Sequence, residues 1–201
     1  MNINRSFLQA LENRRSIYSI GNEPTVSQEE IISIIRRAVK ASPSAFNSQS
    51  ARVIVLFGKS HHKLWEETKN ILRAMVPKES FPKTEEKINS FSRGYGTVLF
   101  FEDQDVVTKL QEKYPLYREN FPVWSLQSSG MLQLAVWTAL EEAGLGANLQ
   151  HYNPLIDETV RENWNAPKSW KLLGQMPFGN VTGEAGPKDF QPVDERMKVF
   201  R

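Results

Sequence analysis

Apolar residues recur with a helical period in the first quarter of the chain. Residues 5–14 place three apolar side chains at helical spacing, and residues 27–30 form a capping box ahead of an isoleucine-rich segment. The pattern predicts two early helices. The second is expected to end before Pro43, because a residue that precedes proline disfavours the helical conformation. The polar residues 42–50 then predict a loop.

Short runs of β-branched and aromatic residues follow. Residues 52–58 and 97–101 are such runs, and they end at a glycine and at acidic residues, respectively, so we expect two buried strands. Residues 60–75 return to a helical period. The segment 77–86 is rich in proline, lysine and glutamate, and we expect it to form an exposed excursion.

The most apolar segment lies in the third quarter of the chain. Residues 102–123 have a helical pattern but carry Pro115 and Pro122, which we expect to break it. Residues 124–143 form the most apolar helix, with apolar side chains on more than one face. Such a helix must be buried on several sides, either at the centre of a domain or in a subunit interface.

The last quarter mixes both kinds of element. Residues 157–165 predict a short helix and residues 171–176 a strand, before a glycine- and proline-rich tail that begins at residue 179. Strands and helices do not alternate strictly, and the sequence has no internal repeat. The pattern therefore predicts a single α+β domain over residues 1–201.

Composition narrows the classes of function. The 201 residues include 25 Lys+Arg and 23 Asp+Glu, and the formal net charge of +2 is too small to indicate nucleic-acid binding. Cysteine is absent, which excludes disulfides, thiolate nucleophiles and cysteine-held metals. No stretch approaches the roughly 20 apolar residues that span a bilayer, and the N-terminus lacks the apolar core of a secretory signal. We expect a soluble, cytoplasmic protein without a membrane partner.

Familiar catalytic motifs do not fit the sequence. Gly144 and Gly146 end a helix instead of opening one, and neither a phosphate-loop motif nor a Gly-x-Ser-x-Gly elbow occurs. His61 and His62 stand among charged residues at a helix start, which favours a solvated face over a metal site. His151 lies in a polar and aromatic segment, where it is either a loop histidine bonded to backbone or part of a site.

Two basic clusters suit an anion. Arg14 and Arg15 stand beside Ser16 at a helix end, and arginine is suited to bidentate binding of phosphate. The alternative is that these arginines only complement the helix dipole. Near the other end, Arg196 and Lys198 occupy alternate positions of a segment that we expect to be extended, so that both can meet one anion.

Four segments stand out by their order and spacing. They are Arg-Arg-Ser-Ile-Tyr at 14–18, Ala-Ser-Pro-Ser-Ala-Phe-Asn-Ser-Gln-Ser at 41–50, and the segments 94–103 and 144–154. Together they resemble the nitroreductase family of FMN-dependent oxidoreductases, and the last two resemble its branch of fungal fatty-acid-repression-mutant proteins and their bacterial relatives. The resemblance implies a nitroreductase-like α+β fold, with a central mixed or antiparallel sheet flanked by helices, and an intertwined homodimer.

The resemblance also implies which residues bind FMN. Basic residues at both ends of the chain would hold the phosphate, polar side chains of 44–49 would approach the ring, partly from the neighbouring subunit, and backbone amides at 150–151 would meet the flavin near N5. It assigns no catalytic side chain and no metal ligand. The implied cofactor-binding residues are Arg14, Arg15, Ser16, Tyr18, Ser44, Asn47, Gln49, Lys87, Gln150, His151, Arg196 and Lys198.

One position departs from the family pattern. Family members usually carry Arg or Lys where this chain has Tyr18, and that cation lies near the N1 and O2 edge of the flavin. Its loss bears on the reduction potential, because positive charge at this edge stabilises the reduced, anionic flavin. Lys87 or Arg93 is expected to replace it. Ser50 also stands where the family usually has proline.

These features lead to one principal hypothesis and two rivals. NADH or NADPH reduces bound FMN by hydride transfer to N5, leaves, and is replaced by a nitroaromatic or quinone acceptor in the same pocket. Tyr114, Tyr117, Phe121 and Trp124 either form a wall of that pocket or pack as ordinary core. The first rival is a flavin-binding regulatory or sensor protein with little turnover. The second, nucleic-acid binding, predicts steep salt dependence and no flavin colour.

Overall fold

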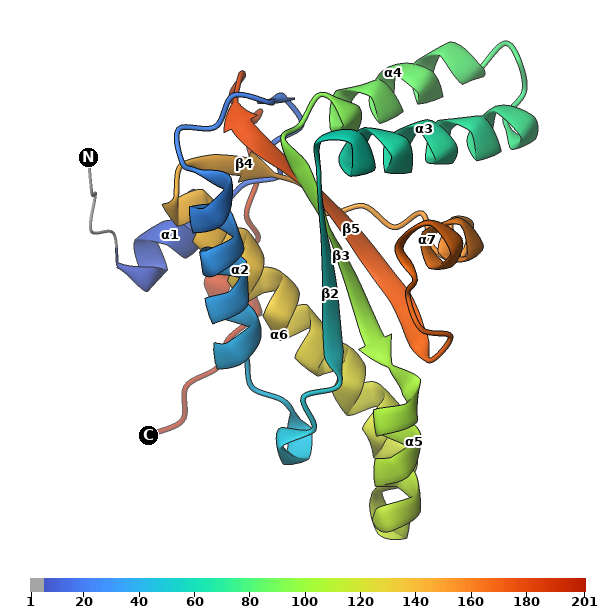
Figure 1. Cartoon of the computed structure of the whole chain (residues 1–201). Helices are drawn as coiled ribbons and strands as arrows, with labels where there is room; N and C mark the ends of the chain where they lie inside the picture. The colour runs from blue at the N-terminus through green and yellow to red at the C-terminus, as the bar shows by residue number, and fades with distance from the viewer. Residues whose placement is uncertain (1–5) are drawn as a thin grey trace.

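A five-stranded antiparallel sheet lies between two layers of helices in residues 6–201, the part of the chain that the computed structural model describes (Figure 1). The strand order is β1-β5-β3-β2, and β4 also pairs with β5. The predicted α+β class is confirmed.

The elements are α1 (Phe7–Asn13), β1 (Ile20–Gly21), α2 (Gln28–Ala41), η1 (Ala45–Asn47), β2 (Ala51–Phe57), α3 (Gly58–Met75), α4 (Phe81–Ser92), β3 (Gly96–Asp103), α5 (Gln104–Lys113), η2 (Pro115–Tyr117), α6 (Asn120–Glu142), β4 (Leu145–Ala147), α7 (Asp157–Trp164), β5 (Trp170–Val181) and η3 (Val193–Glu195).

Helices α2 and α6 cover one face of the sheet. Helix α2 begins as predicted at Ser27, whose hydroxyl accepts a hydrogen bond from the N–H of Glu30 at 3.2 Å. Its buried side chains pack with those of α6 against β3, β4 and β5 in one apolar cluster. This cluster includes Ile31, Ile35, Val98, Phe100, Leu132, Val136, Leu140, Met176 and Phe178.

Helices α3, α4 and α7 cover the opposite face. The exposed excursion predicted for residues 77–86 is confirmed for 77–80 but wrong from Phe81 onward, where α4 begins. Phe81, Ile88 and Phe91 are buried at helical spacing. The charged residues between them dilute the apolar period, which is why the sequence pattern did not reveal the helix.

His61 is buried, contrary to the solvated position expected for it, whereas His62 is exposed. The Nδ1 atom of His61 lies 2.8 Å from the hydroxyl of Thr97, and its Nε2 atom lies 3.2 Å from the carbonyl of Ser92. The indole N–H of Trp65 donates to the same Thr97 hydroxyl at 2.9 Å. Burial lowers the pKa of His61 to about 4, so a neutral imidazole ties α3 to β3.

Helix α6 starts earlier than residue 124, because Pro122 falls in its first turn, where a proline breaks no intrahelical hydrogen bond. Its sheet-facing side is buried, with Leu132 2% exposed. Another face remains open, with the side chains of Val123, Leu126, Met131 and Leu134 between 41% and 53% exposed. Among residues 6–201, no helix combines the length and apolarity needed to cross a membrane.

The chain beyond β5 is an exposed tail. The carbonyl of Val193 accepts hydrogen bonds from the N–H groups of Arg196 and Met197, both at 2.9 Å. The segment that carries Arg196 therefore starts with a turn, and the prediction that this segment is extended is wrong at Arg196. The turn leaves large apolar side chains in solvent, namely Phe190, Val193, Met197, Val199 and Phe200.

Glu102 is a buried carboxyl group near the end of β3. It is 0% exposed, and neither carboxyl oxygen has a well-aligned hydrogen-bond partner in the described part of the chain. Burial raises the pKa of Glu102 to about 7, although the Ser50 hydroxyl and the charge of Arg52 partly oppose this shift. The folded protein therefore retains a proton that the unfolded chain releases at lower pH.

Replacing Glu102 by glutamine should remove a pH-dependent loss of stability. Because the pKa of Glu102 is raised in the fold, its ionisation destabilises the protein progressively as the pH rises from about 4.5 through 7, by up to about 3 kcal/mol. Urea denaturation should therefore show Glu102→Gln gaining stability over the wild type between pH 5 and pH 8. The exposed Glu112→Gln is the matched control. Parallel pH profiles for all three proteins would contradict this assignment.

Candidate functional site

The chain leaves α1 as an irregular segment that is tied to β4. Ser16 forms an isolated parallel bridge with Ala147, and the N–H of Ile17 donates to the carbonyl of Ala147 at 2.9 Å. Gly146 permits this approach, because a Cβ atom there would lie 2.8 Å from Cγ2 of Ile17. The position of Ser16 is therefore fixed by β4.

Two guanidinium groups flank Ser16. That of Arg14 lies 4.4 Å from the ring centroid of Trp137 in α6, and burial, together with the charge of Arg15, lowers the pKa of Arg14 from its usual value. Arg15 donates to the carbonyl of Gly186 in the tail at 2.7 Å. Arginine stays protonated in such settings, so both side chains are cations held in place.

These residues line a cavity of about 340 Å³ together with Tyr18 and the tail residues 184–188. Lys188 adds a further cation to its wall and Glu184 one carboxylate, so the cations outnumber the anion three to one. Sequence reasoning missed Lys188 because no motif surrounds it. Arg196 and Lys198 do not line this cavity. That Arg196 and Lys198 bind the same anion as Arg14 and Arg15 stays a prediction.

Tyr18 and Lys87 meet at one aromatic ring. The ring centroids of Tyr18 and Phe91 are 6.2 Å apart, and Nζ of Lys87 lies 6.0 Å from the centroid of Phe91. Tyr152 also contacts Phe91, and burial, assisted by nearby Tyr18, raises the pKa of Tyr152 to about 12. Lys87 is therefore the cation of this cluster, whereas Arg93 lines a different cavity.

The segment after β4 brings Gln150 and His151 against β5. The N–H of Gln150 donates to the carbonyl of Gln175 at 2.7 Å, and the N–H of Gln175 donates back at 2.9 Å. The backbone amide of Gln150 is thus already used. His151 is exposed, and its N–H has no hydrogen-bond partner within residues 6–201. Of these two amides, that of His151 is open in the sense that no group of residues 6–201 bonds to it.

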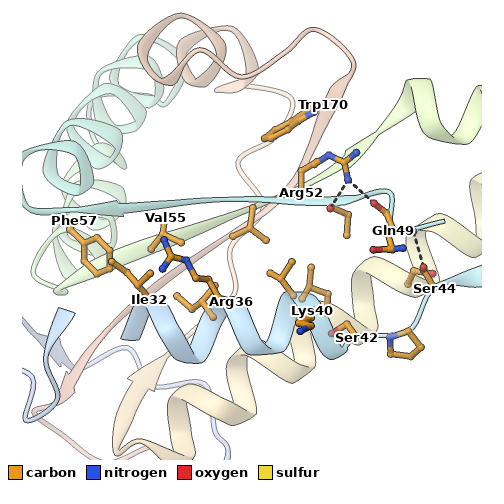
Figure 2. A pocket seen from close by; sticks show the side chains of 17 residues that line it. Ile32, Arg36, Lys40, Ser42, Ser44, Gln49, Arg52, Val55, Phe57 and Trp170 are labelled. Atoms are coloured by element: carbon orange, nitrogen blue, oxygen red, sulfur yellow. Dashed lines mark hydrogen bonds between the residues drawn. The ribbon is translucent and has the colours of Figure 1, made fainter. Parts of the chain in front are cut away.

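The loop over residues 44–49 has a strained backbone. Phe46, Asn47 and Gln49 have φ angles of 57°, 50° and 47°, in the left-handed region that residues other than glycine rarely adopt. The Ser44 hydroxyl accepts a hydrogen bond from the N–H of Gln49 at 2.9 Å, and Arg52 donates to the carbonyl of Gln49 at 2.6 Å (Figure 2). Strain of this kind persists where surrounding contacts enforce it, and it is typical of ligand-binding loops.

A second cavity, of about 690 Å³, lies beside this loop between α2 and β2 (Figure 2). Apolar residues of α2, β2 and α6 form most of its wall, with Ser44 and Gln49 at one end. Figure 2 shows Arg36 between α2 and β2, while Arg52 lies near Trp170 and pairs with Asp103 at 3.0 Å. The cavity is an apolar groove along a strand edge that has no strand partner in the described residues.

Phe46 projects from the loop into a cluster of aromatic rings. Its centroid lies 5.0–5.9 Å from those of four rings, and its plane is 19° from that of Trp124. Phe46 itself is 50% exposed. Sequence reasoning had grouped the four partners but missed Phe46, because a single aromatic residue in a polar loop has no periodicity. The partners are Tyr114, Tyr117, Phe121 and Trp124.

The residues that the sequence analysis grouped as one site lie in two places within one chain. Segment 14–18 lies beside β4 near the start of α2, whereas the loop 44–49 follows the end of α2 (Figure 1). Helix α2 alone, with 14 residues, spans about 21 Å. That both groups contact one ligand, with the loop supplied by a neighbouring subunit, stays a prediction.

Comparison with known proteins identifies the family. A sequence model of the Nitroreductase family matches residues 11–180. The chain belongs to the nitroreductase family. This nitroreductase is 33% identical to nitroreductase FRM2 of Saccharomyces cerevisiae over 189 residues, 92% of this chain and 93% of FRM2. It is 32% identical to HBN1 of the same yeast over 197 residues, 97% of each chain. The resemblance to the fatty-acid-repression-mutant branch is thus confirmed.

Solved structures support the same assignment. Nitroreductase CinD of Lactococcus lactis in complex with nicotinic acid has a TM-score of 0.90 and 49% identity, over 98% of this chain and 100% of CinD. CinD also has structures with chloramphenicol and 4-nitrophenol. An Exiguobacterium sibiricum protein in complex with FMN shares the fold, with a TM-score of 0.72, 14% identity and 98% coverage of both chains. The nitroreductase described here is therefore an oxidoreductase of this fold.

Removing the Ser44 hydroxyl from this nitroreductase should loosen the loop 44–49. Ser44→Ala leaves the N–H of Gln49 without its acceptor while the backbone strain remains, so the free energy of unfolding should fall by about 1 kcal/mol. Amide hydrogen exchange at Gln49 should accelerate. Ser48→Ala is the control, because Ser48 makes only a 3.5 Å contact with Ser50. Equal exchange at Gln49 in both variants would show that the loop does not depend on this bond.

Proposed function

We propose that this nitroreductase is an FMN-dependent NAD(P)H oxidoreductase that reduces nitroaromatic or quinone acceptors. The observation that carries the proposal is the cavity in which Arg14 and Arg15 flank Ser16. Both arginines are held by neutral groups, a tryptophan ring and a backbone carbonyl, and neither has an ion-pair partner among the described residues. Their positive charge is therefore available to an anionic ligand.

The cavity fits the phosphate end of FMN. Guanidinium groups bind phosphate oxygens bidentately, and the Ser16 hydroxyl can donate a further hydrogen bond. Lys188 contributes charge from the cavity wall, and we propose that Arg196 and Lys198 join it when the tail closes over the ligand. Several separated cations would then meet one dianion.

The flavin ring would lie toward the segment after β4. There the open N–H of His151 can donate to a ring nitrogen, and the cluster of Tyr18, Phe91 and Lys87 offers aromatic surface and one positive charge. FMN supplies the hydride-transfer chemistry when bound, and no side chain of the set is needed as an acid or nucleophile. The task of these residues is to bind, orient and provide electrostatic stabilisation.

The electron donor is a reduced nicotinamide, and donor and acceptor use one pocket in turn. Aromatic ligands of the related CinD, such as 4-nitrophenol, support flat acceptors. Phe46 is half exposed and lies against Trp124, so this aromatic cluster provides a flat apolar wall for such molecules. Nitroaromatics and quinones share the required planarity.

A homodimer would complete the site. The open face of α6 and the groove beside β2 are both apolar and unpartnered in the described chain. Gly130 lies in the middle of α6, where a Cβ atom would meet nothing within 4 Å, so this helix can be approached closely by a second helix. Such a dimer brings the loop 44–49 of one chain to the segment 14–18 of the other.

The purified protein should show flavin absorption bands that identify the cofactor. NADH or NADPH added without oxygen should bleach these bands, and a nitroaromatic or quinone should restore them. A colourless protein that FMN cannot load would overturn the proposed function. Bands that persist with both nicotinamides would instead favour a regulatory flavoprotein.

Arg14→Ala should raise the dissociation constant for FMN about tenfold or more, because a charged hydrogen bond is lost. Titration followed by flavin fluorescence measures this dissociation constant. Arg118→Ala, at an exposed residue, is the control.

A charge on the open face of α6 should separate the subunits. Leu134 is 41% exposed in the single chain, so Leu134→Glu leaves the core intact and places a charge in the proposed interface. Light scattering after size exclusion should then show monomers with reduced FMN binding. Met75→Glu, 64% exposed at the end of α3, is the control and should remain dimeric. Leu132 is unsuitable because it is 2% exposed, so a charge there would unfold the chain. A dimeric, flavin-loaded Leu134→Glu would refute this interface.

A further inference from the structure

Three buried residues with carboxamide side chains, Asn148, Gln150 and Gln175, are linked by side-chain and backbone hydrogen bonds beside the proposed flavin site. Asn148 and Gln175 are 0% exposed, and Gln150 is 7% exposed. Burial of an amide is costly unless its donors and acceptors are bonded, so fully buried Asn and Gln residues are uncommon. Their hydrogen bonds run from the segment of Ser16 to the loop beyond His151.

Asn148 forms the first part of this chain. Its Nδ2 donates to the carbonyl of Ile17 at 2.8 Å, and its Oδ1 accepts from Nε2 of Gln150 at 2.8 Å. Ile17 follows Ser16 directly in the sequence. Asn148 therefore ties the anion-binding segment to the segment that carries His151.

Gln175 forms the second part. Its Oε1 accepts from the N–H of Tyr152 at 2.7 Å, and its Nε2 donates to Oδ1 of Asn153 at 3.3 Å. Its backbone exchanges two hydrogen bonds with Gln150. Gln175 thus holds the residues immediately before and after His151, and it fixes the open amide of His151 without touching it.

An irregularity in β5 accompanies this arrangement. Phe100 of β3 pairs with Gly174, but Phe101 pairs with Leu172, so Leu173 is an extra residue in β5. Such a bulge changes the direction of the strand and redirects the side chains that follow it, and bulges are frequent next to active sites. Here the residue that follows Gly174 is Gln175, whose side chain reaches the loop over 152–153.

We propose that Asn148 and Gln175 are positioning residues that set the distance between the anion-binding segment and the open amide of His151. Neither would contact the flavin; each acts through backbone that does. The inference rests on the proposed function, because its consequence is measured on FMN. It extends that function to two residues whose role is geometric, and it predicts that their effects are coupled through the segment 150–152, to which both side chains bond.

Gln175→Met and Asn148→Leu test the inference, since both keep the side-chain volume approximately and remove the hydrogen bonds. Each should raise the dissociation constant for FMN about tenfold and shift the midpoint potential of the bound flavin. The double variant should lose less affinity than the product of the two single losses, because both side chains act on the position of the segment 150–152. Without FMN, amide exchange at Tyr152 should accelerate in Gln175→Met, since its N–H loses its acceptor.

Thr68→Val separates positioning from general loss of stability. Thr68 is 0% exposed and donates to the carbonyl of Leu64 within α3, away from the site. Thr68→Val should lower the melting temperature and leave the FMN affinity and the midpoint potential of the bound flavin unchanged. If the wild-type protein binds FMN and Gln175→Met has the same FMN affinity and midpoint potential, this inference alone is overturned. Wild-type protein that cannot bind FMN would overturn the proposed function and the inference with it.

Discussion

The pairing of β5 along both of its edges is the interaction on which the rest of the structure depends. One edge pairs with β3, a strand with seven of its eight residues buried, and beyond the end of β3 with β1; the other edge pairs with β4 and the backbone of Gln150. Because β4 in turn carries Ser16, three segments distant in sequence are fixed relative to one strand. Formation of the sheet thus positions two parts of the proposed site, the segment 14–18 and the unpartnered N–H of His151.

The same sheet separates the loop 44–49 from the segment 14–18 within one chain. Helix α2 runs between the segment 14–18 and the loop 44–49, so packing α2 onto the sheet separates the two groups. In the proposed site, which uses both groups, the loop would come from a second chain. The loop holds its shape through contacts within its own chain. Its left-handed residues raise the energy of the chain, and the bonds from Ser44 and Arg52 to Gln49 offset that cost and keep the loop preorganised.

Elements that a local sequence pattern determines were predictable, and elements that depend on tertiary packing were not. The apolar runs 53–57 and 98–101 lie within β2 and β3, and the predicted strand positions are confirmed. Burial is confirmed for β3 but not for β2, in which Leu56 alone is buried in the described chain. Helix α4 was missed because its few buried residues are separated by charges, and His61 because its partners Thr97 and Ser92 lie in other elements. The family motifs indicated residues of the anion site, but Lys188 and Trp137 come from outside every motif. Their contribution depends on where the tail and α6 lie.

Arg14 and Arg15 of the proposed anion site differ from arginines that are held in ion pairs elsewhere in the described chain. Arg52 and Arg73 are paired with Asp103 and Glu85 at 3.0 Å and 2.8 Å, so most of their charge is compensated locally. Arg14 and Arg15 are instead held by a ring and a carbonyl, which orient a guanidinium without neutralising it. An arginine oriented by neutral groups retains its attraction for an anion and loses little side-chain entropy on binding. This arrangement has a cost, visible in the lowered pKa of Arg14, and a dianionic ligand would relieve it because opposite charge favours the protonated guanidinium.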